Sequence, residues 1–419
     1  MDKTILLFVC ILCTSCNQDK RTKDLYLDKK QTIKSALTAE LDSIQKNGLI
    51  KGFSVAIVNE RGTLYEKGFG YADIETKKKY TEKTIQHIAS VSKTFIGLSL
   101  LKAQEMGSLN LDDPIQDHLS FKIFNPFYPN IPITIRHLAT HTSGINDTEQ
   151  YMNNAWIITE NQDLTNISMD YPAQRFNLPD KNIPMETYLK GYLLPNEPFY
   201  QEDNYINFKP GERFNYSNIG ATLAALIIEK ATNQKFDLFT QEHILGPLGM
   251  DSSGWSLKDI DISEHSRLYR NDNTLLPFYT AITYPDGMLI SSSSDMAKYL
   301  TELIKGYFGE GTLLTKESYR QLYKKQLSDK HFAANQRNAE KSYSDEYNSG
   351  IFMGYSAFGY VGHTGGDAGV GTWLFFDEKT RTGRYIVKNT DSGNDNQARK
   401  REYHAIWGTM GEYVDRLNK

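Results

Sequence analysis

A serine and a lysine three residues apart, Ser90 and Lys93, could together carry out nucleophilic chemistry. Apolar residues recur at helical spacing over 88–101, and Gly107 is suited to end the helix that they predict. A lysine three positions after a serine lies on the same helix face, one turn later. Serine is a weak nucleophile until a neighbour takes its proton, and a lysine can do so when burial or other cations favour its neutral form. The pair therefore predicts a nucleophile and its base on one rigid element.

The same spacing also fits a serine that caps a helix beside a solvated lysine, and it recurs at Ser43 and Lys46 inside another predicted helix. The sequence contains neither the Gly-x-Ser-x-Gly of α/β-hydrolases nor the His-Glu-x-x-His of zinc peptidases. His137 and His141 could meet on a helix face as metal ligands, but the Thr-Ser-Gly run at 142–144 indicates that the helix ends there. The sequence therefore predicts no metal and no cofactor.

A second candidate group is the Tyr-Ser-Asn run that begins at Tyr216 and ends at Asn218. Tyr151 and Tyr205 also begin Tyr-x-Asn runs, so the pattern by itself does not select Tyr216. Tyr216 differs in its context, because it follows a Pro-Gly turn and precedes a strongly apolar helix over 219–230. A phenol braced by such a helix could relay a proton if nearby cations favour the phenolate, and the asparagine amide could orient a lysine or a substrate carbonyl.

A third group is the Gly-His-Thr-Gly-Gly run at 362–366. Glycines within a strand often mark the close approach of another backbone or of a ligand. A substrate could lie along the edge of such a strand, and backbone N–H groups of the strand could form half of an oxyanion hole. A glycine-rich hairpin without a catalytic role is the alternative.

The chain has 419 residues, 39% of them hydrophobic, which suffices for one large domain or two ordinary ones. Its formal net charge is −4 and it has no polybasic stretch, so a nucleic-acid partner is not expected. Residues 1–15 combine a short basic start with an apolar run too short to span a bilayer, which is typical of a signal peptide. Small residues precede Cys16, as in bacterial lipoproteins, which predicts cleavage there and a lipid on its thiol.

The three cysteines, Cys10, Cys13 and Cys16, all fall in this segment, so a metal or iron–sulfur site is a poor alternative. Residues 16–29 are polar and unpatterned, which predicts a tether. The protein is then expected to be exported to the bacterial cell envelope, facing the periplasm or the outer surface, with the membrane as a partner through its lipid.

The two ends of the remaining chain have matching patterns. A helix and two strands are predicted at 33–44, 53–58 and 63–68, and two strands and a helix at 371–376, 384–388 and 405–417. This arrangement predicts one antiparallel sheet built from both termini, with the middle of the chain inserted into it. Two middle segments lack periodicity. The one at 146–209 is rich in aromatic residues and predicts a partly ordered lid, whereas 328–348 predicts a polar surface excursion.

Together, the Ser-x-x-Lys, Tyr-Ser-Asn and His-Thr-Gly runs resemble the three motifs of the penicillin-recognising serine hydrolases, which include class C β-lactamases, penicillin-binding proteins, D-aminopeptidases and related esterases. The flanks at 137–144, 247–250 and 287–292 also resemble segments of that family. The resemblance implies an α/β (α+β) fold, with an antiparallel sheet of about five strands, flanking N- and C-terminal helices and an inserted, mainly helical region. It implies a catalytic domain at 30–419, with a sheet subdomain at 30–80 and 350–419 and a helical subdomain at 81–349.

The resemblance also implies roles for residues at matching positions. Ser90 would be acylated, Lys93 would accept its proton, and Tyr216 would serve as base and then as acid for the leaving group. The backbone N–H groups of Ser90 and Gly366 would form the oxyanion hole. The expected substrate-binding residues are Asn218, His363, Thr364, Gly365, Gly366 and, by a looser alignment, Asn389.

His363 departs from the β-lactamase pattern, which has lysine at this place, and resembles the esterase and D-aminopeptidase branches. The expected function is that of a serine hydrolase acting through an acyl-enzyme on a small amide, ester or D-amino-acid peptide. The alternatives are a true β-lactamase, a D,D-carboxypeptidase, or a penicillin-binding receptor that is acylated without turnover.

Overall fold

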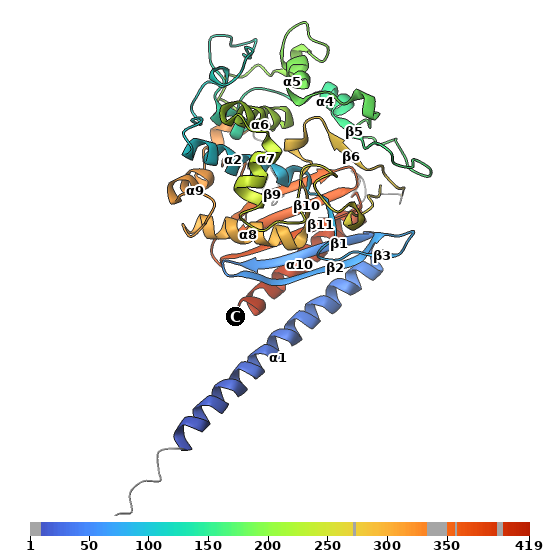
Figure 1. The fold of residues 1–419 in the computed structure, drawn as a ribbon, viewed down its shortest axis with the longest axis vertical. Coiled ribbons are helices and arrows are strands. Elements are labelled where there is room, and N and C mark those ends of the chain that lie inside the picture. Colours follow the sequence, from blue (N-terminus) through green and yellow to red (C-terminus); the bar gives the residue numbers. More distant parts are fainter. Residues whose placement is uncertain (1–9, 271–273, 333–349, 357, 392–396) are drawn as a thin grey trace, which may run out of the picture.

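A computed structural model describes residues 10–270, 274–332, 350–356, 358–391 and 397–419. Its centre is a seven-stranded sheet in the order β3-β2-β1-β11-β10-β9-β8 (Figure 1). The first and last long strands of the chain pair antiparallel in the middle of this sheet, with Val55 opposite Ile386. The sheet strands are β1 (Gly52–Asn59), β2 (Gly62–Asp73), β3 (Lys78–Lys79), β8 (Gly354–Tyr355), β9 (Tyr360–Asp367), β10 (Val370–Asp377) and β11 (Thr382–Lys388).

This topology confirms the antiparallel sheet built from both termini. The expected strand number of about five was too low, because the two edge strands β3 and β8 have two residues each. A strand of two residues has no alternating pattern that a sequence could reveal. Two further pairs lie outside the main sheet: β4 (Ile85–His87) with β7 (Ile290–Ser292), and β5 (Trp156–Ile158) with β6 (Tyr279–Ala281).

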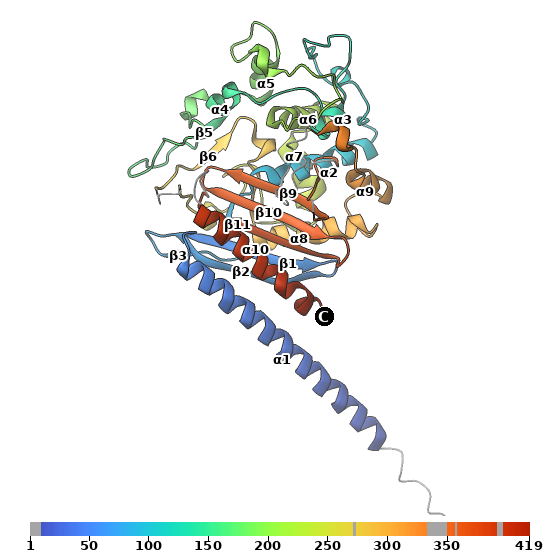
Figure 2. The same cartoon turned by 180° about the vertical axis from the view of Figure 1, so that it is seen from behind.

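Helices cover both faces of the sheet. The terminal helices α1 and α10 lie together on one face, and α8 packs against the other (Figures 1 and 2). The α-helices are α1 (Cys10–Asn47), α2 (Lys93–Glu105), α3 (Ile135–Ala139), α4 (Glu149–Asn154), α5 (Met185–Leu193), α6 (Asn218–Thr232), α7 (Phe236–Thr240), α8 (Ser293–Tyr307), α9 (Lys316–Tyr323) and α10 (Gln397–Asn418).

Short helical turns complete the inserted region. They are η1 (Ala89–Ser92), η2 (Ile115–Asp117), η3 (Pro179–Lys181), η4 (Glu202–Asn204), η5 (Gln241–Leu245), η6 (Ile262–Glu264), η7 (Tyr284–Asp286) and η8 (Asp329–His331). The segment 328–348, expected as a surface excursion, includes η8, but its residues 333–348 lie outside the described part of the chain.

The strand β1 shows how the two faces are filled. Phe53, Val55 and Ile57 belong to the core beneath the terminal helices. Ala56 and Val58 belong to the larger core on the other face. Because successive side chains of a strand point to opposite faces, a strand covered on both sides is continuously apolar. This burial explains why the run that predicted the strand is apolar at every position except the buried Ser54.

The helix α1 extends well beyond the predicted helix at 33–44 and includes residues 16–29, which the composition predicts to be a tether. Its N-terminal part projects away from the rest of the protein (Figure 1). Among the described residues, no helix has both the length and the apolar character that a membrane span requires. Residues 1–9 of the predicted signal peptide lie outside the described part.

The aromatic segment 146–209 lies at the opposite end of the molecule from the projecting helix (Figure 1). It contains α4, β5, α5 and two short helical turns. Its strand β5 pairs with β6, with Trp156 opposite Ala281, so the segment is hydrogen-bonded to a distant part of the chain. This arrangement places the aromatic segment next to β9, which contains the Gly-His-Thr-Gly-Gly run, since Trp156 donates a hydrogen bond to Asp367 at the end of that strand.

Candidate active site

The predicted nucleophile Ser90 lies on the helical turn η1, directly before α2. The single helix expected over 88–101 is therefore divided into this tight turn and an α-helix that begins at Lys93. Ala89 has a φ of 49°, in the left-handed region that side chains rarely occupy, so the backbone is strained next to the serine. Such strain occurs where surrounding structure holds a functional group in a required position.

Lys93 faces Ser90 as the spacing predicted. Its Nζ donates a hydrogen bond to Ser90 Oγ at 3.0 Å and another to the backbone oxygen of Asp286 at 2.5 Å. The lysine is fully buried. Burial disfavours the charged form of an amine, and a lysine must be neutral to accept the proton of a serine.

The strand β9 approaches this turn closely at Gly365. A Cβ at Gly365 would lie 2.6 Å from the backbone oxygen of Ile88, so only glycine fits there. The hydroxyl of Thr372, opposite Gly365 on β10, donates to the same Ile88 oxygen at 2.8 Å. At Gly366 a Cβ would meet no atom within 4 Å. Gly365 therefore allows the sheet to approach the turn that carries Ser90.

Tyr216 lies above the lysine, with Lys93 Nζ 5.1 Å from the centroid of its ring. The imidazole of His141 stacks on the Tyr216 ring, with the two ring centroids 4.4 Å apart. Its Nδ1 accepts a hydrogen bond from the backbone N–H of Ser217 at 3.1 Å. Burial, then the charges of Lys93 and His363, hold the pKa of His141 well below its usual value. His141 is therefore a neutral side chain that braces the tyrosine.

Asp147 fixes the asparagine of the same run. Its carboxylate accepts hydrogen bonds from the backbone N–H of Asn218 at 2.7 Å and from the Asn218 side-chain amide at 2.9 Å. It also accepts from the hydroxyl of Ser217 and the backbone N–H of Ile219, both at 3.1 Å. These donors lie at the N-terminus of α6, where backbone N–H groups lack helical partners and attract a negative charge. Burial nevertheless raises the pKa of Asp147.

A second buried carboxylate, Asp286, lies beside the lysine. Its Oδ2 accepts hydrogen bonds from the hydroxyls of Tyr151 at 3.2 Å and Thr222 at 3.1 Å. Burial raises the pKa of Asp286 to about 7, and the charge of Lys93 limits that rise. The site thus contains an acid that titrates near neutrality next to the predicted base.

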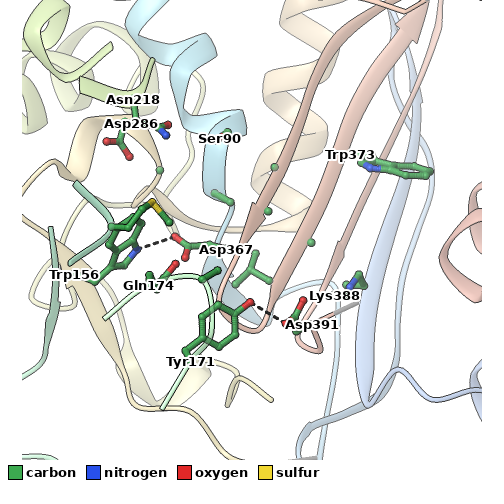
Figure 3. A pocket seen from close by; sticks show the side chains of 18 of the residues that line it. Ser90, Trp156, Tyr171, Gln174, Asn218, Asp286, Asp367, Trp373, Lys388 and Asp391 are labelled. Atoms are coloured by element: carbon green, nitrogen blue, oxygen red, sulfur yellow. Dashed lines mark hydrogen bonds between the residues drawn. The ribbon is translucent and has the colours of Figure 1, made fainter. Parts of the chain in front are cut away.

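Ser90, Asn218 and Asp286 line a cavity of about 490 Å³ (Figure 3). The remaining polar groups of the site lie outside this lining: Lys93, Tyr216, His141 and Asp147. Two hydrogen bonds cross between the lid segment and the opposite wall: Trp156 Nε1 donates to Asp367 at 3.3 Å, and the Tyr171 hydroxyl donates to Asp391 at 2.8 Å. The lining consists of Ala89, Ser90, Tyr151, Met152, Trp156, Tyr171, Ala173, Gln174, Asn218, Asp286, Gly287, Gly365, Gly366, Asp367, Val370, Gly371, Trp373, Lys388, Asp391, Lys400, Tyr403 and His404.

Of the predicted substrate-binding residues, Asn218, Gly365 and Gly366 line this cavity, whereas His363, Thr364 and Asn389 are not among the lining residues. His363 is 1% exposed, its Nδ1 donates to the backbone oxygen of Thr364 at 2.6 Å, and its ring lies 6.3 Å from that of Tyr216. It therefore borders the tyrosine.

Asn389 is fully buried and connects three backbone segments. Its Oδ1 accepts from the backbone N–H of Gly52, and its amide donates to the Tyr71 backbone oxygen and the Ser266 hydroxyl. These bonds give it a structural role in this conformation, and contact with a substrate stays a prediction for Asn389.

Tyr205 and Tyr151, which also begin Tyr-x-Asn runs, differ from Tyr216 in their surroundings. The hydroxyl of Tyr205 donates to the backbone oxygen of Leu193 at 3.0 Å inside the core. Tyr151 lies in the cavity wall, which sequence reasoning did not anticipate. Asp147 and Asp286 were also missed. Each lies next to a stretch that resembled the family, since Asp147 follows the Thr-Ser-Gly run and Asp286 precedes Gly287.

The candidate metal ligands do not form a metal centre in the described part of the chain, where no group of three His, Cys, Asp or Glu side chains could hold an ion. His137 instead accepts a hydrogen bond from the backbone N–H of Thr134 at the start of α3. As the Thr-Ser-Gly run indicated, α3 ends at Ala139, before His141.

The sequence model of the protein family described as Beta-lactamase matches residues 37–406 of this chain. Protein flp of Staphylococcus aureus strain MW2 is 30% identical over 223 residues, which cover 53% of this chain and 38% of that protein.

Two solved structures have the same fold. The D-amino acid amidase from Ochrobactrum anthropi SV3, complexed with L-phenylalanine amide, has a TM-score of 0.65 at 18% identity and covers 91% of this chain and 99% of its own. The β-lactamase/D-alanine carboxypeptidase from Pseudomonas syringae has a TM-score of 0.61 at 18% identity and covers 90% of this chain and 99% of its own.

Proposed function

Because the chain belongs to the β-lactamase family of serine hydrolases, we propose that it hydrolyses a small amide, ester or D-amino-acid peptide through an acyl-enzyme on Ser90. The observation that carries this proposal is the 3.0 Å hydrogen bond between the buried Lys93 and the hydroxyl of Ser90, on the wall of a cavity. A serine whose hydroxyl contacts a buried amine has both parts of an activated nucleophile.

In the proposed acylation, Lys93 accepts the proton of Ser90 as the oxygen attacks the substrate carbonyl. The backbone N–H groups of Ser90 and Gly366 stabilise the resulting oxyanion, and both residues line the cavity. Tyr216 lies beside Lys93 and passes the proton to the leaving group. Asn218, held by Asp147, orients the substrate amide.

The cavity supports a small substrate. Its volume of about 490 Å³ lies in the usual range for small-molecule sites. The amidase with the same fold is complexed with an amino-acid amide, which is the size and chemistry proposed here. The lining includes the carboxylates Asp286, Asp367 and Asp391 as well as Lys388 and Lys400, so the walls carry both signs of charge.

Efficient β-lactam or D,D-peptide hydrolysis is the second candidate, favoured by the shared fold with the β-lactamase/D-alanine carboxypeptidase. A receptor that is acylated without turnover is the third. Product release separates an enzyme from a receptor, because a receptor stops at one equivalent of product whereas an enzyme continues.

The proposal is tested by covalent labelling with a fluorophosphonate probe. Ser90→Ala should abolish the label, because it removes the nucleophilic oxygen, and circular dichroism should show that the variant remains folded. Ser43→Ala is the matched control, since Ser43 repeats the Ser-x-x-Lys spacing within α1, and it should label like the wild type. A label that persists on the Ser90 variant would show that another residue is the nucleophile.

We also propose that the protein is anchored to a membrane of the cell envelope by a lipid on Cys16. The short apolar run and the small residues before Cys16 support this proposal. Cys16→Ser should move the protein out of the membrane fraction, or leave an uncleaved precursor. A mature N-terminus at another residue, without lipid mass on Cys16, would contradict the anchor.

A further inference from the structure

The structure contains a buried carboxylate that the roles described so far do not use. We propose that Asp286 is a catalytic residue of the second half-reaction, in which its carboxylate accepts the proton of the water that removes the acyl group from Ser90. This inference rests on the proposed acyl-enzyme and assigns the step that makes the protein an enzyme instead of a receptor.

The position of Asp286 is the first support. Asp286 lines the same cavity as Ser90 and Asn218 (Figure 3), and it is 3% exposed. Its backbone oxygen holds the Nζ of Lys93 at 2.5 Å. The carboxylate therefore belongs to the residue that positions the lysine, and any water that enters the cavity to reach the acyl group enters a space that Asp286 borders.

The hydrogen bonds of the carboxylate are the second support. Tyr151 from the lid segment and Thr222 from α6 both donate to Oδ2. Two donors on one oxygen fix the rotation of the carboxylate and stabilise its charged form. Oδ1 is then the oxygen that we assign to the water proton.

The electrostatic surroundings suit a general base. The pKa of Asp286 is raised to about 7, chiefly by burial and also by the charge of Asp147. The charge of Lys93 and hydrogen bonds from the Thr283 and Thr222 hydroxyls limit the rise. The hydroxyl of Tyr151 is the third titratable group that faces the carboxylate. A base works best when its pKa lies near the operating pH, so a carboxylate with this value is well matched to neutral conditions.

The chemistry balances if Asp286 and Lys93 share one proton, as coupled buried groups do. With the proton on Asp286, the neutral amine of Lys93 accepts the proton of Ser90 during acylation, and Tyr216 passes that proton to the leaving group. The shared proton then moves to Lys93. The water oxygen bonds to the acyl carbon and its proton passes to Asp286. The bond from the acyl carbon to Ser90 Oγ breaks, and Oγ takes the proton of Lys93. The acid product leaves and the starting state is restored.

The test is a burst experiment with p-nitrophenyl acetate on the full chain. In Asp286→Asn, p-nitrophenol should appear in a burst of about one equivalent at a rate within about threefold of the wild type. The later steady rate should fall by about 10² to 10⁴-fold, the usual contribution of one general base. Intact-mass spectrometry should then show the acetyl adduct accumulating on the variant.

Asp295→Asn is the matched control. Asp295 is also 3% exposed, and it accepts hydrogen bonds from the backbone N–H of Ser252 and the hydroxyl of Ser253, away from the cavity. Its loss should lower the melting temperature and leave the ratio of burst to steady rate unchanged. Equal losses in the burst and the steady rate of Asp286→Asn, or an unchanged steady rate, would overturn the assignment.

A second variant keeps the proposal testable if Asp286→Asn does not fold. Tyr151→Phe removes one donor from Oδ2, which should raise the pKa of Asp286 and move the pH midpoint of the steady rate upward. An unmoved midpoint would overturn the proposal. The absence of an acetyl adduct from both the wild type and Asp286→Asn would instead overturn the acyl-enzyme itself.

Discussion

The imidazole of His141 lies face to face with the phenol ring of Tyr216, with ring centroids 4.4 Å apart and an interplanar angle of 28°. The same imidazole accepts the backbone N–H of Ser217. His141 itself has a φ of 54°, so the bend after α3 turns its ring toward the tyrosine. One neutral side chain therefore fixes both the ring of Tyr216 and the backbone next to it.

His141→Phe should show what this brace contributes. The variant keeps an aromatic ring but removes the acceptor, which leaves the Ser217 N–H buried without a partner at a cost of about 1–3 kcal/mol in the free energy of unfolding. We expect kcat to fall more than KM rises, because Tyr216 loses its fixed position.

Denaturant unfolding and steady-state kinetics with a neutral ester measure the two effects of His141→Phe. His137→Gln is the control, since His137 accepts the Thr134 N–H at the start of α3. It should lose stability at unchanged kcat. A His141 variant that behaves like this control would show that the brace serves only folding.

Tyr216→Phe should leave substrate binding largely intact and reduce kcat by roughly two to four orders of magnitude, the usual contribution of one acid–base group. Tyr205→Phe is the matched control, because Tyr205 begins another Tyr-x-Asn run but its hydroxyl donates a hydrogen bond to the backbone oxygen of Leu193. That variant should lose about 1 kcal/mol of stability and keep its turnover. Equal kinetic losses in both variants would remove Tyr216 from the mechanism.

His363→Lys should change the preference among substrates. A lysine carries its charge at neutral pH, whereas a histidine with an ordinary pKa is mostly neutral there. We expect kcat/KM for an ester that carries a carboxylate to rise about tenfold relative to an uncharged ester with the same leaving group, which corresponds to about 1.4 kcal/mol.

The paired esters form the internal control for His363→Lys, since a general loss of activity cancels in their ratio. An efficient penicillinase in the wild type, indifferent to this substitution, would contradict the proposed role of His363 in specificity and leave the serine mechanism in place.

Acid should destabilise the protein through His87 and His265. Burial, together with the neighbouring His265, lowers the pKa of His87 to about 3, and burial lowers that of His265 to about 4. Both are neutral when folded, whereas in the unfolded chain they take up protons below about pH 6.5. Each should therefore remove up to about 1.4 kcal/mol of unfolding free energy per pH unit as the pH falls from 6.5 toward 4.

Melting temperatures between pH 7 and pH 4.5 measure this effect. The double variant His87→Gln, His265→Gln has no charge to gain at these positions, so its melting temperature should fall less steeply with acid. His118→Gln is the control, because His118 is paired with Asp113 near the surface. Identical slopes in the wild type and the double variant would assign the acid sensitivity to other groups.

The Ser90–Lys93 pair and the main strands and helices could be predicted from the sequence alone, because each depends on residues that are close together in the chain. The spacing of Ser90 and Lys93 places both groups on one side of a helical turn, and the structure joins them at 3.0 Å. Short apolar runs predicted β1 and β11, and helical periodicity predicted the terminal helices, because each pattern reports which sides of a local element are buried. The antiparallel sheet follows from those elements, although the two-residue edge strands left no pattern.

The contacts between polar groups from distant parts of the chain could be found only in the tertiary structure. Asn218 and Asp147 are 71 residues apart, and Lys93 and the backbone of Asp286 are 193 residues apart. Local spacing cannot encode such contacts, because they arise when the inserted helical region packs against the sheet. That packing assigned Tyr205 to the core and Tyr151 to the cavity, although both share the Tyr-x-Asn pattern with Tyr216. Burial by the same packing raised the pKa of Asp286, because a carboxylate removed from water resists ionisation.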